Sequence, residues 1–137
     1  MKKLMLLLLV SLFTSFTYGQ TILDKIKAQA IENGLKHIHD VEFELQEDGL
    51  GSSFITLAPG DYKIFGMGGF SEVKDIDLFI YNYNTDELIA KENTEIDGIT
   101  ILNITLEEAT RVWIKVYNRK SSPELEYYEC YLLITKF

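Results

Sequence analysis

Apolar residues recur at every second position in eight short segments of this 137-residue sequence, and turn signals separate the segments. The clearest segment is residues 75–84, which reads Asp-Ile-Asp-Leu-Phe-Ile-Tyr-Asn-Tyr-Asn. Side chains of an extended chain alternate between two faces, so one face of this strand is apolar and the other is acidic and aromatic. The apolar face consists of Ile76, Leu78 and Ile80.

The remaining segments are similarly short and lie between turns rich in glycine, proline, asparagine and aspartate. Such regular spacing is typical of β-sandwiches and β-barrels. No helical pattern lies between the segments, which excludes a parallel βαβ architecture. The predicted strands are residues 41–45, 54–58, 61–67, 75–84, 88–91, 99–106, 111–118 and 127–135.

Residues 21–35 have the periodicity of an amphipathic helix. Thr21 is the expected N-cap, and Gly34 is the expected stop signal. A helix of about 15 residues is only marginally stable alone, so its apolar stripe requires a partner. We expect it to pack across one sheet; the alternative is an arm that binds another protein. The stripe consists of Ile22, Leu23, Ile26, Ala30 and Ile31.

The N-terminus has the pattern of a secretory signal peptide. Lys2 and Lys3 precede an apolar run over residues 4–13, which is too short to span a bilayer. Small residues before Gln20 predict cleavage between Gly19 and Gln20. We therefore expect a secreted or periplasmic protein with no membrane span in the mature chain. The expected organisation is a signal peptide at residues 1–19, a helix and linker at 20–40, and a β-sandwich domain at 41–137.

The sequence is acidic, with 21 Asp and Glu against 13 Lys and Arg, which gives a net charge of −8. Loss of Lys2 and Lys3 with the signal peptide makes this −10. This charge disfavours nucleic acid and anionic lipid as partners, and it leaves calcium and basic partners open. The single cysteine, Cys130, lies in an apolar strand, so we expect a buried thiol and no intrachain disulfide.

From Leu57 to Ile134, the order of these signals resembles the bacterial pre-peptidase C-terminal (PPC) domain. The resemblance implies a secreted jelly-roll β-sandwich of a kind that accompanies proteases and other hydrolases, and that in some cases binds matrix protein, polysaccharide or calcium. No catalytic domain accompanies the module here, and the helix at residues 21–35 is not part of the family pattern. The matching stretches are residues 57–62, 75–81, 88–90, 112–117 and 131–134.

The expected fold is therefore all-β, an antiparallel jelly-roll-like β-sandwich of about eight strands with one N-terminal amphipathic helix.

Asp75 and Asp77 allow three interpretations: a general acid–base pair, calcium ligands together with Glu72, or residues that shape the entrance of a strand. Paired carboxylates catalyse only with a substrate between them, and no cleft-forming insertion is visible. Calcium requires six to eight oxygen ligands, and the sequence contains no calcium-binding repeat. We favour the structural role, with calcium as the alternative and no other cofactor.

The histidines of the sequence lie outside any recognisable hydrolase motif. His37 and His39 are the only two, and no Gly-x-Ser-x-Gly motif accompanies them. Two histidines one residue apart face the same way, but a zinc site normally requires three or four ligands. We therefore expect a protein that is not an enzyme.

Aromatic residues at outward strand positions are the main functional signal. We predict a ligand site at Phe79, Tyr81, Trp113 and Tyr117. Such rings stack on sugars and anchor protein interfaces. The alternative is that they are ordinary strand residues covered by the helix. Three further outward aromatics are Tyr83, Tyr127 and Tyr131.

The leading hypothesis is a secreted, non-catalytic binding or accessory module for an extracellular polysaccharide, peptide or partner protein. One alternative is a structural or assembly protein that forms a homodimer through the helix and the aromatic face. Another is an inhibitor-type partner of a secreted enzyme, for which the acidic charge is the only indication.

Overall fold

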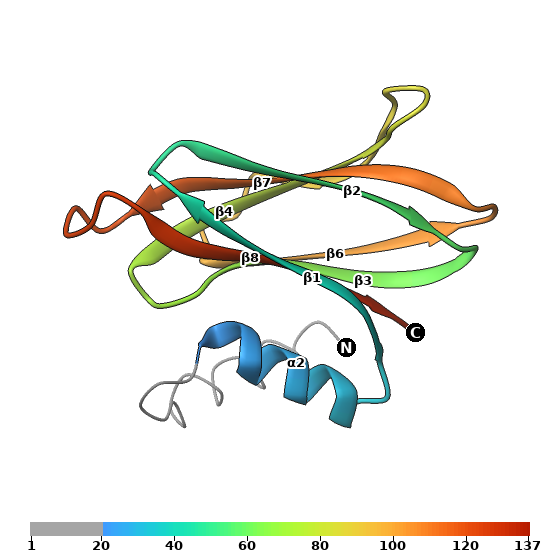
Figure 1. Cartoon of the computed structure of the whole chain (residues 1–137), viewed down its shortest axis with the longest axis horizontal. Helices are drawn as coiled ribbons and strands as arrows, with labels where there is room; N and C mark the ends of the chain where they lie inside the picture. The colour runs from blue at the N-terminus through green and yellow to red at the C-terminus, as the bar shows by residue number, and fades with distance from the viewer. Residues whose placement is uncertain (1–20) are drawn as a thin grey trace.

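Two four-stranded antiparallel sheets make up the body of the computed structural model, which describes residues 21–137. The predicted signal peptide lies outside the described residues. Within these residues there are eight strands and one helix, arranged in the two layers and covering helix of Figure 1. The elements are α2 (Ile22–Glu32), β1 (Lys36–Leu45), β2 (Gly49–Leu57), β3 (Gly60–Gly68), β4 (Val73–Asn82), β5 (Leu88–Glu92), β6 (Ile99–Leu106), β7 (Thr110–Ser121) and β8 (Tyr128–Lys136).

The strand order identifies a jelly roll. One sheet has the order β1-β8-β3-β6 and the other has β2-β7-β4-β5, with every neighbouring pair antiparallel. Except between β4 and β5, each strand is followed by one in the opposite sheet. Two interlocked four-stranded sheets of this kind define the jelly-roll class. The predicted fold class, an antiparallel β-sandwich with one helix, is confirmed.

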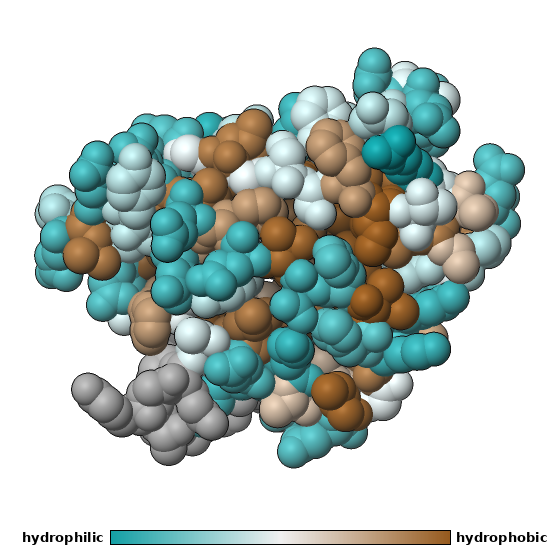
Figure 2. All heavy atoms as spheres, viewed as in Figure 1, coloured by the Kyte–Doolittle hydropathy of each residue, from teal (hydrophilic) through white to brown (hydrophobic). Residues whose placement is uncertain are grey.

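The core lies between the sheets and consists of the apolar half of each alternating strand. Ile76, Leu78 and Ile80 of β4 are fully buried there, as predicted. Cys130 of β8 is also fully buried, and this burial raises the pKa of its thiol to about 12. Figure 2 shows hydrophobic residues across the middle of the molecule and hydrophilic residues along its margins. The thiol is thus a core side chain that remains protonated at neutral pH.

The largest differences from the sequence-based boundaries are at the starts of β1 and β2. β1 begins at Lys36, so the whole of the expected linker after residue 35 is a strand that pairs with β8. The turn expected at residues 47–53 is shorter, because β2 begins at Gly49 and Asp48 supplies the positive φ of 62°. Gly51 belongs to the strand, where a Cβ atom would lie 2.6 Å from the ring of Phe43. This glycine allows a close approach within the core and does not mark a loop.

α2 packs on the outer face of the β1-β8-β3-β6 sheet, on the lower side of Figure 1. Thr21 caps the helix as predicted, with its hydroxyl accepting a hydrogen bond from the Asp24 N–H at 3.3 Å. The expected packing of the helix across a sheet is confirmed. Within residues 21–137, no helix has the length and apolar character needed to cross a membrane. The second apolar cluster that results consists of Ile22, Leu23, Ile26, Phe65, Met67, Ile99, Tyr131 and Leu133.

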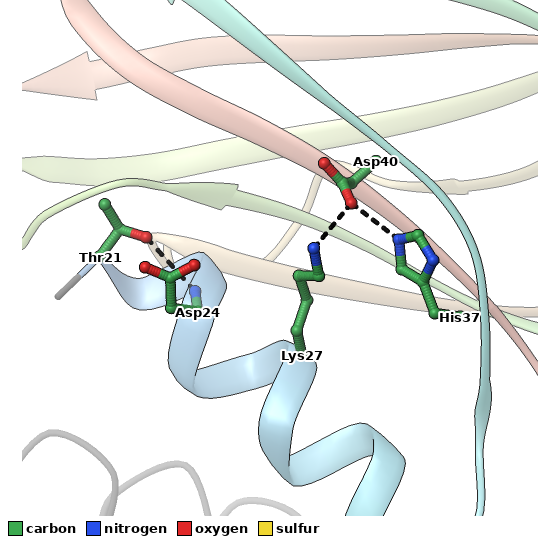
Figure 3. A network of polar contacts seen from close by, with 5 residues as sticks. All are labelled: Thr21, Asp24, Lys27, His37 and Asp40. Carbon is green, nitrogen blue, oxygen red and sulfur yellow. Dashed lines mark hydrogen bonds and ion pairs between the residues drawn. The ribbon is translucent and has the colours of Figure 1, made fainter.

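A polar clamp joins the helix to β1 (Figure 3). Lys27 Nζ lies 3.0 Å from Asp40 Oδ2, and His37 Nε2 lies 2.7 Å from the same oxygen. Burial by itself raises the pKa of Asp40, but hydrogen bonds from Lys27 and His37 outweigh it and the net shift is downward. Because these groups are about one-third exposed, the ion pair contributes at most about 1 kcal/mol. Apolar burial therefore holds the helix, and the clamp helps to set its position.

We expect Ile26→Ala to lower the free energy of unfolding by about 2–4 kcal/mol, because Ile26 is 4% exposed and fills the second apolar cluster. The matched control is Ile31→Ala on the same helix, where the side chain is 59% exposed and the change should stay within about 0.5 kcal/mol. Urea unfolding measures both values. Equal effects of the two substitutions would contradict this docking of the helix.

Candidate functional site

The outer face of the β2-β7-β4-β5 sheet lies on the side of the sandwich opposite α2 (Figure 1). No helix covers it within the described residues. Its central strand β7 presents cationic and aromatic side chains in turn, since the alternate residues Val112, Ile114 and Val116 are buried in the core. We call this surface the aromatic–cation face, and it comprises Phe54, Phe79, Tyr81, Tyr83, Trp113, Tyr117, Arg111, Lys115 and Arg119.

Three rings form a row across three strands. Trp113 of β7 is directly paired with Phe54 of β2 on one side and with Tyr81 of β4 on the other. The Phe54 and Trp113 rings are stacked with centroids 5.7 Å apart, and the Trp113 and Tyr81 centroids are 5.9 Å apart. Cross-strand aromatic pairs of this kind stabilise a sheet. They also place Trp113 at the centre of the face.

Three further rings extend this row along the strands. Tyr83 contacts Phe54 edge-on with centroids 5.2 Å apart, and Phe79 lies 6.5 Å from Tyr81. Tyr117 then meets Phe79 at 5.5 Å. The six rings thus form one continuous chain, in which each touches the next. Phe54 and Tyr83 are 47% and 40% exposed, and the remaining four rings are half-buried.

Three cations from β7 lie over these rings. Lys115 Nζ is 3.9 Å from the centroid of the Trp113 ring, and the Arg111 guanidinium is 4.2 Å from that of Tyr83. The Arg119 guanidinium is 4.3 Å from the centroid of Tyr117. A cation over an aromatic face is attracted by the ring quadrupole, and the contact contributes about 0.5–1 kcal/mol at exposed sites. Both π surfaces and positive charge are therefore available on this face.

The four predicted ligand residues, Phe79, Tyr81, Trp113 and Tyr117, lie together on the aromatic–cation face. Their role in binding stays a prediction. Two other aromatics do not lie in this ring chain: Tyr131 is buried beneath α2, and Tyr127 lies in the loop before β8.

Sequence reasoning did not assign Phe54 or the cations to the site. Arg111 and Lys115 share the outward alternation of Trp113, and that signal is readable in the sequence. Phe54 is different, because its place depends on the pairing of β2 with β7. The pairing joins positions nearly 60 residues apart in the chain.

Asp75 and Asp77 lie beside this face, close to Arg119. Arg119 Nε donates a hydrogen bond to Asp77 Oδ2 at 2.8 Å, while Asp77 Oδ1 is buried with no partner within the described residues. Burial, and next the charge of Asp77, raise the pKa of Asp75. Within residues 21–137, no three His, Cys, Asp or Glu side chains form a group that could hold a metal ion.

The fold also gives the position of His37 and bears on the homodimer hypothesis. His37 lies at the start of β1 and contacts Asp40, on the sheet that carries α2. The helix and the aromatic–cation face are on opposite sides of the sandwich. An isologous interface, in which the same surface of both copies meets, therefore cannot contain both surfaces. The homodimer itself stays a prediction.

We expect Asp75→Asn to raise Tm at pH 7 by about 2 °C, because it removes a carboxylate that is unfavourably placed beside Asp77. The folded-state pKa of Asp75 is raised, so its cost is fully present above that pKa and disappears as the pH falls below the unfolded value. The gain should therefore vanish near about pH 3.5. Glu108→Gln, an exposed change of the same charge, is the control. A lower Tm for Asp75→Asn at pH 7 would contradict this view.

A calcium site at Asp75, Asp77 and Glu72 stays a prediction that the same melts test. Ligand that binds only the folded state raises Tm with concentration. A calcium-dependent rise that Asp75→Asn abolishes would establish the site, and identical melts in calcium and in chelator would exclude a tight one.

Comparison with known proteins supports the fold. No family model matches the sequence, and no curated protein matches it. Among solved structures, the chain is similar to the pre-peptidase C-terminal domain of collagenase from Bacillus anthracis, with a TM-score of 0.53 and 10% identity over 72% of this chain and 89% of that one. It is also similar to a surface-associated copper-binding protein of Methylomicrobium album BG8, with a TM-score of 0.52 and 8% identity over 72% and 93% of the two chains. The predicted resemblance to the PPC domain is thus confirmed at the level of the fold.

Proposed function

We propose that this chain is a secreted or periplasmic, non-catalytic accessory module that binds an extracellular polysaccharide through the aromatic–cation face. The observation that carries the proposal is the continuous chain of six rings on the one outer sheet face that α2 leaves open. Aromatic rings supply large contact area at a small cost in conformational entropy, and clusters of exposed apolar residues mark interaction sites.

The shape of the face favours a polymer over a small molecule. Small ligands are normally held in concave pockets that bury most of their surface. Here the side chains stand on a broad sheet, and the ring chain runs from Tyr83, which lies beside Arg111, to Tyr117, about six residues or about 20 Å along β7. Several consecutive units of an extended chain are needed to contact rings spread over that length. This supports a polysaccharide ligand that lies along the sheet.

Two features support a role without catalysis. The Cys130 thiol is buried in the core and is protonated at neutral pH, so it is not available as a nucleophile. His37 is engaged with Asp40 on the opposite sheet, away from the aromatic–cation face. Two of the solved proteins of similar fold are the pre-peptidase C-terminal domain of a collagenase and a surface-associated copper-binding protein, and the surface association of the second is consistent with the proposed location.

We expect Trp113→Ala to weaken polysaccharide binding roughly thirtyfold, the loss typical of a central aromatic anchor worth about 2 kcal/mol. Affinity electrophoresis in gels that contain neutral or charged polysaccharides measures the effect as lost retardation. Tyr127→Ala, which removes an exposed ring outside the face, should leave binding unchanged. Thermal melts verify that both variants fold.

Two outcomes would contradict the proposal. Equal retardation of Trp113→Ala and the unmodified protein would show that the site lies elsewhere. If no polysaccharide of either kind retards the unmodified protein, the binding function itself is wrong.

A further inference from the structure

Positive charge on the aromatic–cation face is regularly spaced. Arg111, Lys115 and Arg119 occupy every fourth position of β7 and all lie over aromatic rings. At about 3.3 Å per residue, successive cations are about 13 Å apart along the strand. Trp113 and Tyr117 stand between them. Lys91 of β5 adds a fourth, exposed cation, because it pairs with Phe79 in the neighbouring strand.

Two of these cations form no ion pair within the described residues, although the chain has more acidic than basic side chains. The sequence has 21 carboxylate side chains against 13 Lys and Arg. Nevertheless, neither Arg111 nor Lys115 takes part in an ion pair within the described part of the chain. Only Arg119 does so, with Asp77. Arg111 and Lys115 are instead held over rings, so their charge remains available to a ligand.

Lys115 also bears on which ligand can reach the rings. Its ammonium lies over Trp113 at 3.9 Å and over Tyr81 at 5.0 Å from the centroids. A neutral sugar that stacked on these rings would have to displace the ammonium and would offer no charge in return. An anionic sugar unit can stack beside the ammonium and form an ion pair with it. Charge-assisted hydrogen bonds of this type are roughly twice as strong as neutral ones.

We propose that the ligand of this face is an anionic polysaccharide, a chain of carboxylate- or sulfate-bearing sugars. The inference rests on the proposed function and deepens it: sugar rings contact the aromatic residues, and their acidic groups contact Arg111 and Lys115. The acidic net charge does not oppose this, because salt screens exposed charges beyond about 8–10 Å. Arg111 and Lys115 are within that distance of a ligand on the face, and Asp77, a carboxylate beside it, is already paired with Arg119.

Trp113 provides a direct probe, because it is the single tryptophan of the sequence and stands at the centre of the face. The experiment is a titration of its fluorescence with two matched pairs of polymers. Polygalacturonate is compared with its methyl-esterified form, and dextran sulfate with dextran. We expect at least one anionic member to bind at least tenfold more tightly than its neutral partner and to bind more weakly at high salt. The pair that responds identifies carboxylate or sulfate as the group bound.

Lys115→Gln should weaken binding of that anionic polymer about tenfold, since a hydrogen bond to a charged group is lost. Lys115→Arg, which keeps the charge, should retain most of the affinity. Lys36→Gln is the matched control, because it removes an exposed lysine from β1 on the opposite sheet. Loss of affinity in Lys115→Gln but not in Lys36→Gln assigns the anion to this face.

The contrary results are distinguishable. Equal binding of the neutral and anionic members, lost in Trp113→Ala, overturns the inference and leaves the proposed function intact. Poly-L-glutamate, an anionic polymer without sugar rings, is a further probe. If it binds as tightly as the acidic polysaccharides, the inference is overturned as well, because charge alone would then be recognised. Failure of every polymer to bind removes the proposed function together with the inference.

Discussion

The packing of α2 against one outer sheet face decides which surface of the sandwich is left open. A two-layer sandwich has two outer faces, and this chain has apolar side chains for both. Ile22, Leu23 and Ile26 cover Phe65, Tyr131 and their neighbours on the β1-β8-β3-β6 sheet. Within residues 21–137, no helix covers the aromatic residues of the other sheet, and they pack on one another and under cations. The apolar side chains of one face are thus buried under α2, whereas those of the other face form a surface of aromatic rings and cations.

Alternation along single strands was readable from the sequence, and pairing between strands was not. The period of two placed Ile76, Leu78 and Ile80 in the core and Phe79, Tyr81, Trp113 and Tyr117 outward, because that depends only on local geometry. Whether two outward rings meet depends on which strands are neighbours. For that reason Phe54 was missed and Tyr131 was grouped with rings of the other sheet. The start of β1 at Lys36 was likewise hidden, since polar residues at a sheet margin show no alternation and are fixed by the partner strand β8.

The aromatic–cation face carries positive charge although the net charge of the protein is negative. Asp77 forms an ion pair with Arg119, yet Arg111 and Lys115 of β7 lie over aromatic rings. An aromatic ring holds a cation without neutralising it, whereas a carboxylate neutralises the charge that it pairs with. Alternation of Arg, Trp, Lys, Tyr and Arg along one strand therefore yields a surface that is both apolar and positive. Average composition alone gives no sign of such a surface, and it left calcium and basic partners open.

The place of β8 in the strand order has a consequence for the order in which the sheets can form. β8 is the last strand in sequence but lies between β1 and β3, which do not pair with each other. Until β8 has joined, β1 has no neighbour in its sheet, and the platform for α2 lacks Tyr131 and Leu133. The β2-β7-β4-β5 sheet depends on no strand later than β7. The sheet with the aromatic residues is therefore complete in sequence first, and the opposite sheet becomes complete only when β8 pairs with β1 and β3.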